Sequence, residues 1–242
     1  METIWYSTRI KASHQPIHWS RRLPIVVVAV LLPAIHMSRV TIRQLESQNN
    51  IRQSVFAFHS YHDEYKRLPT ANAPERNQTH PVSWRVKILP FLDRADLYKQ
   101  YHLDEPWDSE DNLKLIDQMP DVFRGPNSRA EKGHTVFLAA SGDSGAFPNW
   151  TGGEPAKFKL ESIPDGLTET IALVEVPDEF AVPWTKPDFG IDPDNVEFQD
   201  LLGQHSTAGS VVATMDGAVL PSSNLHCQRC FRAMPTRAME AR

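Results

Sequence analysis

The chain has 242 residues, of which 40% are hydrophobic and 23% are charged, and its formal net charge is −5. This composition excludes wholesale disorder, and the negative charge gives no support for a nucleic-acid partner. Its two cysteines, Cys227 and Cys230, both lie near the end, so the sequence before them contains no disulfide. Nineteen prolines against eleven glycines predict many short elements bounded by loops.

A polar and basic segment, residues 1–22, precedes an apolar segment, residues 23–35. As a helix the apolar segment would be about 20 Å long, whereas crossing a bilayer takes roughly 20 residues. Its place near the N-terminus and its basic flank are typical of a signal or signal-anchor segment, and we expect membrane insertion or export. The alternative is a buried core helix or strand. The anchor residues would be Leu23, Ile25, Val26, Val27, Val28, Val30, Leu31, Leu32 and Ile35.

A long amphipathic helix is predicted beyond Pro33, a residue that would kink it. Its apolar positions recur at intervals of four and three, which indicates one helix face packed on the rest of the protein. The helix should end near Arg67, because Pro69 disfavours a helical conformation at the residue before it. The positions of the stripe are Ile51, Val55, Phe58, His62 and Tyr65.

Short helices are expected after a polar loop over residues 70–81. Ser83 is the expected N-cap of a helix at residues 84–89, and a second short helix covers residues 94–101. A third helix should run to Ile116, with Asp108 or Ser109 as its cap.

Strands are expected in the second half of the chain. Short β-branched runs bounded by Gly, Pro and Asp predict strands at residues 122–126, 135–140 and 170–176. Two apolar runs flank Asp216 and Gly217, the usual occupants of a type I′ hairpin turn. Helices first and strands later predict an α+β fold with an antiparallel sheet.

Six sequence blocks occur in a fixed order: AFHSYHDEYKRLP, SWRVKILPFL, PWDSEDN, SIPDGLTETIALVEV, VPWTKPD, and His205 ahead of the Asp216-Gly217 pair. Together they resemble the bacterial pilin-like family called domain of unknown function 1559. The resemblance implies a long N-terminal helix laid against a small antiparallel sheet, and no enzymatic activity. It also implies a domain, residues 36–221, anchored in the cell membrane on its extracytoplasmic side, with pilin-like or secretion-system proteins as partners. A basic tail, residues 222–242, would follow.

The chain departs from this family at three places. Counted back from Pro33, the glycine and glutamate of the family's prepilin signal fall on Ala12 and Ile17. Two cysteines that the family carries fall on Ser47 and Gly125, and losing both is expected if they normally pair. Ten residues separate His205 from Asp216, one more than in the family signature.

Carboxylates gather around Trp107, at residues 104–111, and again at residues 188–194. Oxygen-rich loops suit calcium, which takes six to eight oxygen ligands. Neither stretch fits the EF-hand pattern, so solvated acidic loops are the alternative. Calcium is the one cofactor considered, and its candidate ligands are Asp108, Asp111, Asp188, Asp192 and Asp194.

Other candidate sites are weaker. His59 and His62 could present two metal ligands on one helix face, or pack on the sheet and donate to carbonyls. The Cys227/Cys230 pair could be half of a zinc site, a redox pair or a local disulfide. Residues 142–145, Gly-Asp-Ser-Gly, resemble a protease nucleophile loop, but the upstream histidine block that would supply the base is absent.

Tryptophans leave a further alternative open. They could line a carbohydrate-binding surface or fill the core. The predicted function is therefore a non-catalytic, membrane-anchored protein of the cell envelope, with an exported solute- or polysaccharide-binding module as the alternative. The tryptophans concerned are Trp84, Trp107, Trp150 and Trp184.

Overall fold

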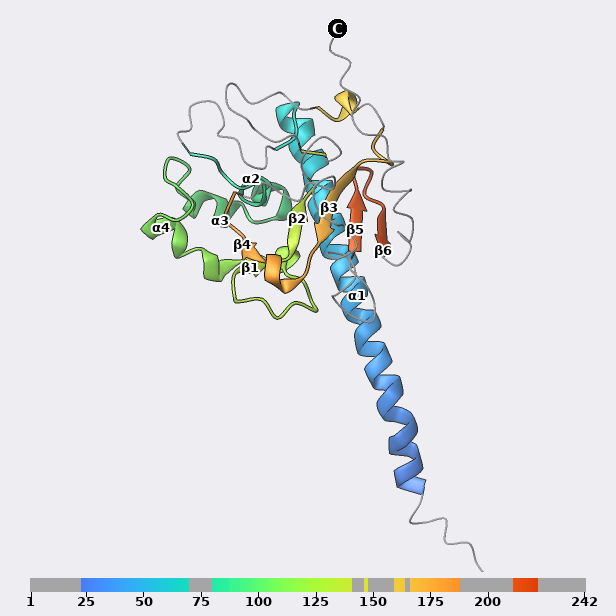
Figure 1. Ribbon diagram of the computed structural model, residues 1–242. Helices are drawn as coiled ribbons and strands as arrows, with labels where there is room; N and C mark the ends of the chain where they lie inside the picture. Colours follow the sequence, from blue (N-terminus) through green and yellow to red (C-terminus); the bar gives the residue numbers. More distant parts are fainter. Residues whose placement is uncertain are drawn as a thin grey trace, which may run out of the picture. The chain divides into compact units, whose positions relative to one another are not determined.

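Helix α1, Leu23–Tyr65, is the longest element of the computed structural model shown in Figure 1. The structure describes residues 23–69, 80–140, 146–147, 159–163, 166–187 and 211–221, and within these ranges the side chains of residues 38 to 220. The chain divides into two compact units, Met1–Thr41 and Ile42–Arg242. Among the residues whose side chains are described, no helix is long and apolar enough to cross a membrane. The anchor predicted at residues 23–35 lies outside them and stays a prediction.

The part of α1 that belongs to the second unit buries the predicted apolar face. Ile51, Val55 and Phe58 are fully buried, and His62 is nearly so. Tyr65, in contrast, is 50% exposed, because the helix ends at this residue and Lys66 turns the chain with a φ of 54°. The helix therefore ends close to the predicted position, and only the last residue of the predicted stripe lies outside the core.

The predicted short helices are present. Helix α2, Trp84–Lys87, begins after Ser83, whose hydroxyl accepts from the Arg85 N–H, and the chain continues as a 3₁₀ helix, η2, Leu89–Leu92. Helix α3 spans Ala95–Gln100. Helix α4, Glu110–Leu113, is capped by Ser109 and ends earlier than predicted, because a 3₁₀ helix, η3, Ile116–Gln118, follows it.

The strand predicted at residues 122–126 is wrong. Asp121–Phe123 forms a 3₁₀ helix, η4, after Pro120, and the Phe123 N–H donates to the Pro120 carbonyl at 3.0 Å. Asn50 of α1 donates its side-chain amide to the Asp121 and Arg124 carbonyls, at 3.1 and 3.0 Å. This segment thus satisfies its carbonyls on a helix side chain instead of a strand ladder.

A four-stranded antiparallel sheet in the order β2-β3-β5-β6 forms the second half of the fold (Figure 1). Its strands are β2 Phe137–Ala139, β3 Ile171–Glu175, β5 Val211–Thr214 and β6 Val219–Pro221. A separate antiparallel pair joins β1, His134–Thr135, to β4, Val182–Pro183. Two further 3₁₀ helices are η5, Leu160–Ser162, and η6, Asp178–Phe180. The predicted α+β fold with an antiparallel sheet is confirmed.

The hairpin of β5 and β6 forms as predicted, but its turn is of another type. The Gly217 N–H donates to the Thr214 carbonyl, and the Thr214 N–H donates to the Ala218 carbonyl, both at 3.0 Å. Within this turn only Gly217 has a positive φ, 86°. A type I′ turn needs positive φ at both central residues, whereas a glycine in the left-handed region after the turn is typical of a longer connection with a bulge.

Aromatic rings from distant segments fill the core between helix and strands. Phe58 of α1 lies edge-on to Trp84 and to Phe147, with ring centroids 5.1 Å apart in both pairs. Phe123 stacks on Trp184 at 6.1 Å. Because Trp84 and Trp184 are fully buried, they belong to the core and not to a surface.

Candidate functional site

A buried asparagine organises the charged loop between α3 and α4. The Asn112 side-chain oxygen accepts from the His102 N–H at 2.9 Å, and its amide donates to the carbonyls of His102 and Pro106, at 3.1 and 3.0 Å. The Asn112 N–H donates to the hydroxyl of Ser109, the cap of α4. One residue thereby ties both ends of the loop together, and charged side chains from the two ends of the loop become neighbours.

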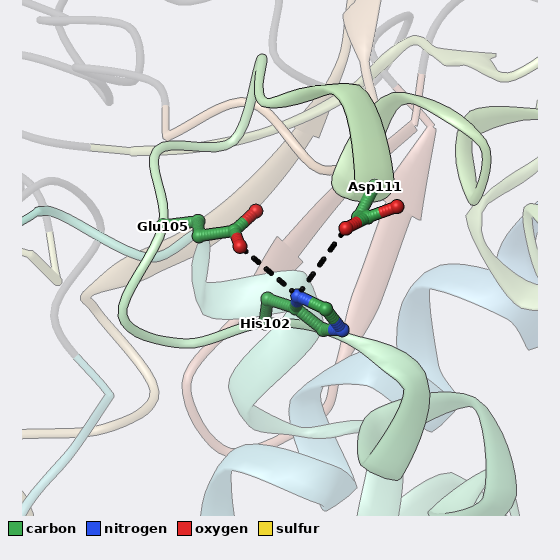
Figure 2. A group of neighbouring side chains, drawn as sticks. All are labelled: His102, Glu105 and Asp111. Carbon is green, nitrogen blue, oxygen red and sulfur yellow. Dashed lines mark hydrogen bonds and ion pairs between the residues drawn. The ribbon is translucent and has the colours of Figure 1, made fainter.

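Three of these side chains converge on one point, as Figure 2 shows: His102, Glu105 and Asp111. His102 Nδ1 lies 3.2 Å from Glu105 Oε1 and 3.8 Å from Asp111 Oδ2. Their potential ligand atoms all lie within 4.8 Å of one another. All three side chains are at least 40% exposed, so the cluster is open to water.

The cluster is also an ion-pair network. The hydrogen bond to Glu105 raises the pKa of His102, and the nearby Asp111 adds to this effect. Hydrogen bonds from Ser109 and from His102 lower the pKa of Glu105, and the bond from Ser109 has the larger effect. Lys114 Nζ, at 2.7 Å from Asp111 Oδ1, lowers the pKa of Asp111. Each charge thus has an opposite neighbour, although such exposed pairs contribute little to stability.

One nitrogen and two carboxylate donors suit a transition-metal ion better than calcium, which binds oxygen almost exclusively. The remaining coordination positions would fall to water, and Lys114 would have to release Asp111. Of the predicted calcium ligands, Asp111 belongs to the cluster and Asp108 does not. Asp188, Asp192 and Asp194 lie outside the described residues, so the calcium site stays a prediction. The sequence analysis did not predict His102 as a member of this cluster, because only the hydrogen bonds of Asn112 bring His102 close to Asp111.

His59 and His62 serve different partners. His59 Nε2 lies 2.6 Å from the Met215 carbonyl, which can only accept, so the ring nitrogen donates. His62 Nε2 lies 3.4 Å from both the Leu160 N–H and Glu161 Oε2. The two rings therefore join α1 to separate segments. His59 donates to a carbonyl, as in the alternative to metal binding, whereas His62 contacts an N–H and a carboxylate of η5.

Comparison with known proteins finds a family match for residues 38–155. This segment matches the model of a protein family described as protein of unknown function (DUF1559). Over that segment the chain is similar to this family. No curated protein and no solved structure matches the chain. This match confirms the resemblance recognised in the sequence, while the predicted His205 signature lies beyond the matched segment.

The Asp216-Gly217 pair, predicted as part of a family signature, attaches the hairpin to α1. The Asp216 carboxylate accepts from the Thr214 hydroxyl and the Ala218 N–H, which shapes the turn. The Gly217 carbonyl accepts from Arg52 Nε at 3.3 Å. His205, the other residue of the predicted signature, lies outside the described residues.

Ser47 and Gly125, the positions where the DUF1559 family resemblance places cysteines, both lie next to Glu175. The Ser47 hydroxyl donates to Glu175 Oε2 at 2.7 Å. A Cβ atom on Gly125 would lie 3.5 Å from Glu175 Oε1. Two positions 78 residues apart are therefore brought to one buried carboxyl.

The remaining candidates are placed as follows. Trp107 is partly exposed and faces Lys186, whose Nζ lies 5.7 Å from the ring centroid. The Cys227/Cys230 pair, Trp150 and residues 142–145 lie outside the described residues.

Proposed function

We propose that the protein is a non-catalytic, pilin-like structural or interaction protein of the cell envelope, held at the membrane by residues 23–35. The observation that carries the proposal is the span of α1. This one helix, Leu23–Tyr65, includes the apolar segment and also the residues that bind the sheet. An anchor built into the same helix as the docking face suits a protein that is displayed at a membrane.

The domain holds α1 through polar bonds on both sides of its apolar stripe. Ser47 bonds to Glu175 of β3, while Arg52 and His59 bond to the hairpin turn at Gly217 and Met215. Between these bonds, Val55 and neighbouring apolar side chains are fully buried. Burying such a side chain stabilises a fold by about 1.5–3 kcal/mol, so the helix is a structural part of the domain.

The charged cluster also favours a structural role. His102, Glu105, Asp111 and Lys114 pair with one another at the surface. Catalytic acids and bases are usually set in clefts that shift their pKa through burial. Burial of Trp84 and Trp184 weakens the alternative of a carbohydrate-binding surface. Partners among pilin-like or secretion-system proteins, with the domain on the extracytoplasmic side, are part of the proposal.

The test is the intact mass of the native protein together with its partition after an alkaline membrane wash. We expect a full-length chain that stays with the membrane. A Val27→Asp/Val28→Asp variant should be released by the wash, because charged residues in the centre of an apolar segment oppose insertion. A wild-type chain cut near residues 35–38 and recovered as soluble protein would overturn the anchor.

A further inference from the structure

Glu175 is a buried acid at the junction of four segments. It is the last residue of β3 and only 7% exposed. Ser47 of α1 donates to Glu175 Oε2 at 2.7 Å, and the Val211 N–H, at the start of β5, donates to the same carboxyl group. Gly125 approaches from the loop after η4, where a Cβ atom would lie 3.5 Å from Oε1. No other hydrogen bond between the described side chains links α1 to β3.

The charges around this carboxyl are unfavourable to its ionised form. The groups facing it are the neutral Ser47 hydroxyl from α1, the Val211 amide from β5, and Gly125, which has no side chain. The charged group that acts on it is another acid, Asp178 of η6. Within the described residues, no lysine, arginine or histidine forms an ion pair with Glu175. A buried carboxylate without a cation is costly and tends to take up a proton instead.

We propose that Glu175 makes the seating of α1 on the sheet dependent on protonation: the neutral acid is compatible with burial between the helix and β3, and ionisation favours opening of this contact to water. The neutral acid can keep the hydrogen bond to Ser47 without placing a charge in the core. The ionised acid must either remain buried without water or become hydrated at the α1–β3 contact. Hydration separates the helix from the strand locally.

The direction of the pH dependence follows from burial. Burial raises the pKa of Glu175 from 4.5 to about 7, against the opposing hydrogen bonds from Ser47 and Val211. Stabilisation by the neutral acid is therefore complete below pH 4.5, the unfolded value, and is lost as the pH rises to about 7. Between these values the folding equilibrium constant should fall about tenfold per pH unit through this single group.

The experiment compares the full-length, detergent-solubilised protein with its Glu175→Gln variant by urea unfolding from pH 5 to pH 8. Glutamine has the shape of the neutral acid and cannot ionise. We expect the ratio of the wild-type to the variant folding constant to fall roughly 70-fold over this range. Glu46→Gln, which removes an exposed acid next to Ser47 on the same helix, should leave the wild-type pH dependence intact. Parallel curves for wild type and Glu175→Gln would overturn the proposal.

A local measurement separates a change at the Ser47–Glu175 contact from a change in the stability of the whole fold. At pH 7.5, amide hydrogen exchange of α1 around Ser47 should be faster in the wild type than in Glu175→Gln. Comparison at one pH removes the pH dependence of the exchange chemistry itself. The Ser47→Ala variant loses a donor to the carboxylate, so the pH midpoint should move upward. Exchange that differs only outside α1 and β3 would contradict the proposal. An unmoved midpoint in Ser47→Ala would also contradict it, and this second test remains usable if Glu175→Gln does not fold.

Discussion

At the residue scale, the amide of Asn112 has the largest effect on the candidate site. Its side chain is fully buried and replaces three backbone hydrogen bonds that the loop cannot make with itself. Asn50 performs the same chemistry on the carbonyls of Asp121 and Arg124, but it is partly exposed. Comparing Asn112 with Asn50 therefore shows how burial changes the contribution of a polar contact to the free energy of unfolding.

Asn112→Ala should lower the free energy of unfolding by about 2–4 kcal/mol, because it leaves buried backbone groups without partners. Asn50→Ala should cost only about 0.5–1.5 kcal/mol, since water can reach the carbonyls that it releases. Urea unfolding of both variants measures the difference. Equal losses of unfolding free energy in the two variants would show that burial of Asn112 does not matter. A smaller loss in Asn112→Ala than in Asn50→Ala would contradict the conclusion that Asn112 holds the loop between α3 and α4.

At the element scale, the hairpin turn and α1 are in close contact. Gly217 has a φ of 86°, and a Cβ atom added to it would lie 2.9 Å from Phe56 Cε1. Gly166 has nearly the same backbone, with a φ of 80°, but a Cβ atom there would meet nothing within 4 Å. The first glycine is needed for the turn and for the approach of the helix, whereas the second is needed for its turn alone.

Gly166→Ala should therefore cost about 1–2 kcal/mol, the strain of a side chain in the left-handed region. Gly217→Ala should cost more, about 2–4 kcal/mol, since it adds a contact with the Phe56 ring to the same strain. Thermal or urea unfolding gives both values. Adding Phe56→Ala to Gly217→Ala should recover the excess, and no recovery would mean that the ring does not press on the turn.

At the scale of the whole molecule, the core of the second unit is complete without the N-terminal segment. In the described part of the chain, buried side chains begin at Ser47 and continue through the sheet. They form a single hydrophobic cluster to which α1 contributes Ile51, Val55, Phe58 and Tyr61. The unit that starts at Ile42 therefore holds what a cooperative fold requires.

A chain beginning at Ile42 should unfold cooperatively, with a midpoint within about 3 °C of the full-length protein, because it keeps every side chain that is buried in the described part of the protein. A chain beginning at Phe58 should show no cooperative transition, since it lacks the buried Ile51 and Val55 and also Ser47, which donates to Glu175. Circular dichroism during heating distinguishes the two. Loss of the transition in the longer chain would show that residues before Ile42 are part of the fold.

Local sequence determined the elements whose signals are short in range. The Ser83 and Ser109 caps, the stop of α1 before Pro69 and the apolar runs around Asp216 each depend on a few neighbouring residues. The α+β class followed from their order, and the ordered blocks led to the family. The strand predicted at residues 122–126 failed because Asn50, more than 70 residues away, binds its carbonyls.

Only the tertiary structure decided which distant residues meet. Tyr65 fits the helical spacing of the stripe, but the helix end leaves it exposed and Tyr61 buried. His102 joins Asp111 through the side chain of Asn112, and Glu175 acquires its character from Ser47, Gly125 and Asp178. Sequence patterns report spacing along the chain. The charge of a buried acid depends on the water and partners around it in space, and these exist only once the chain has folded.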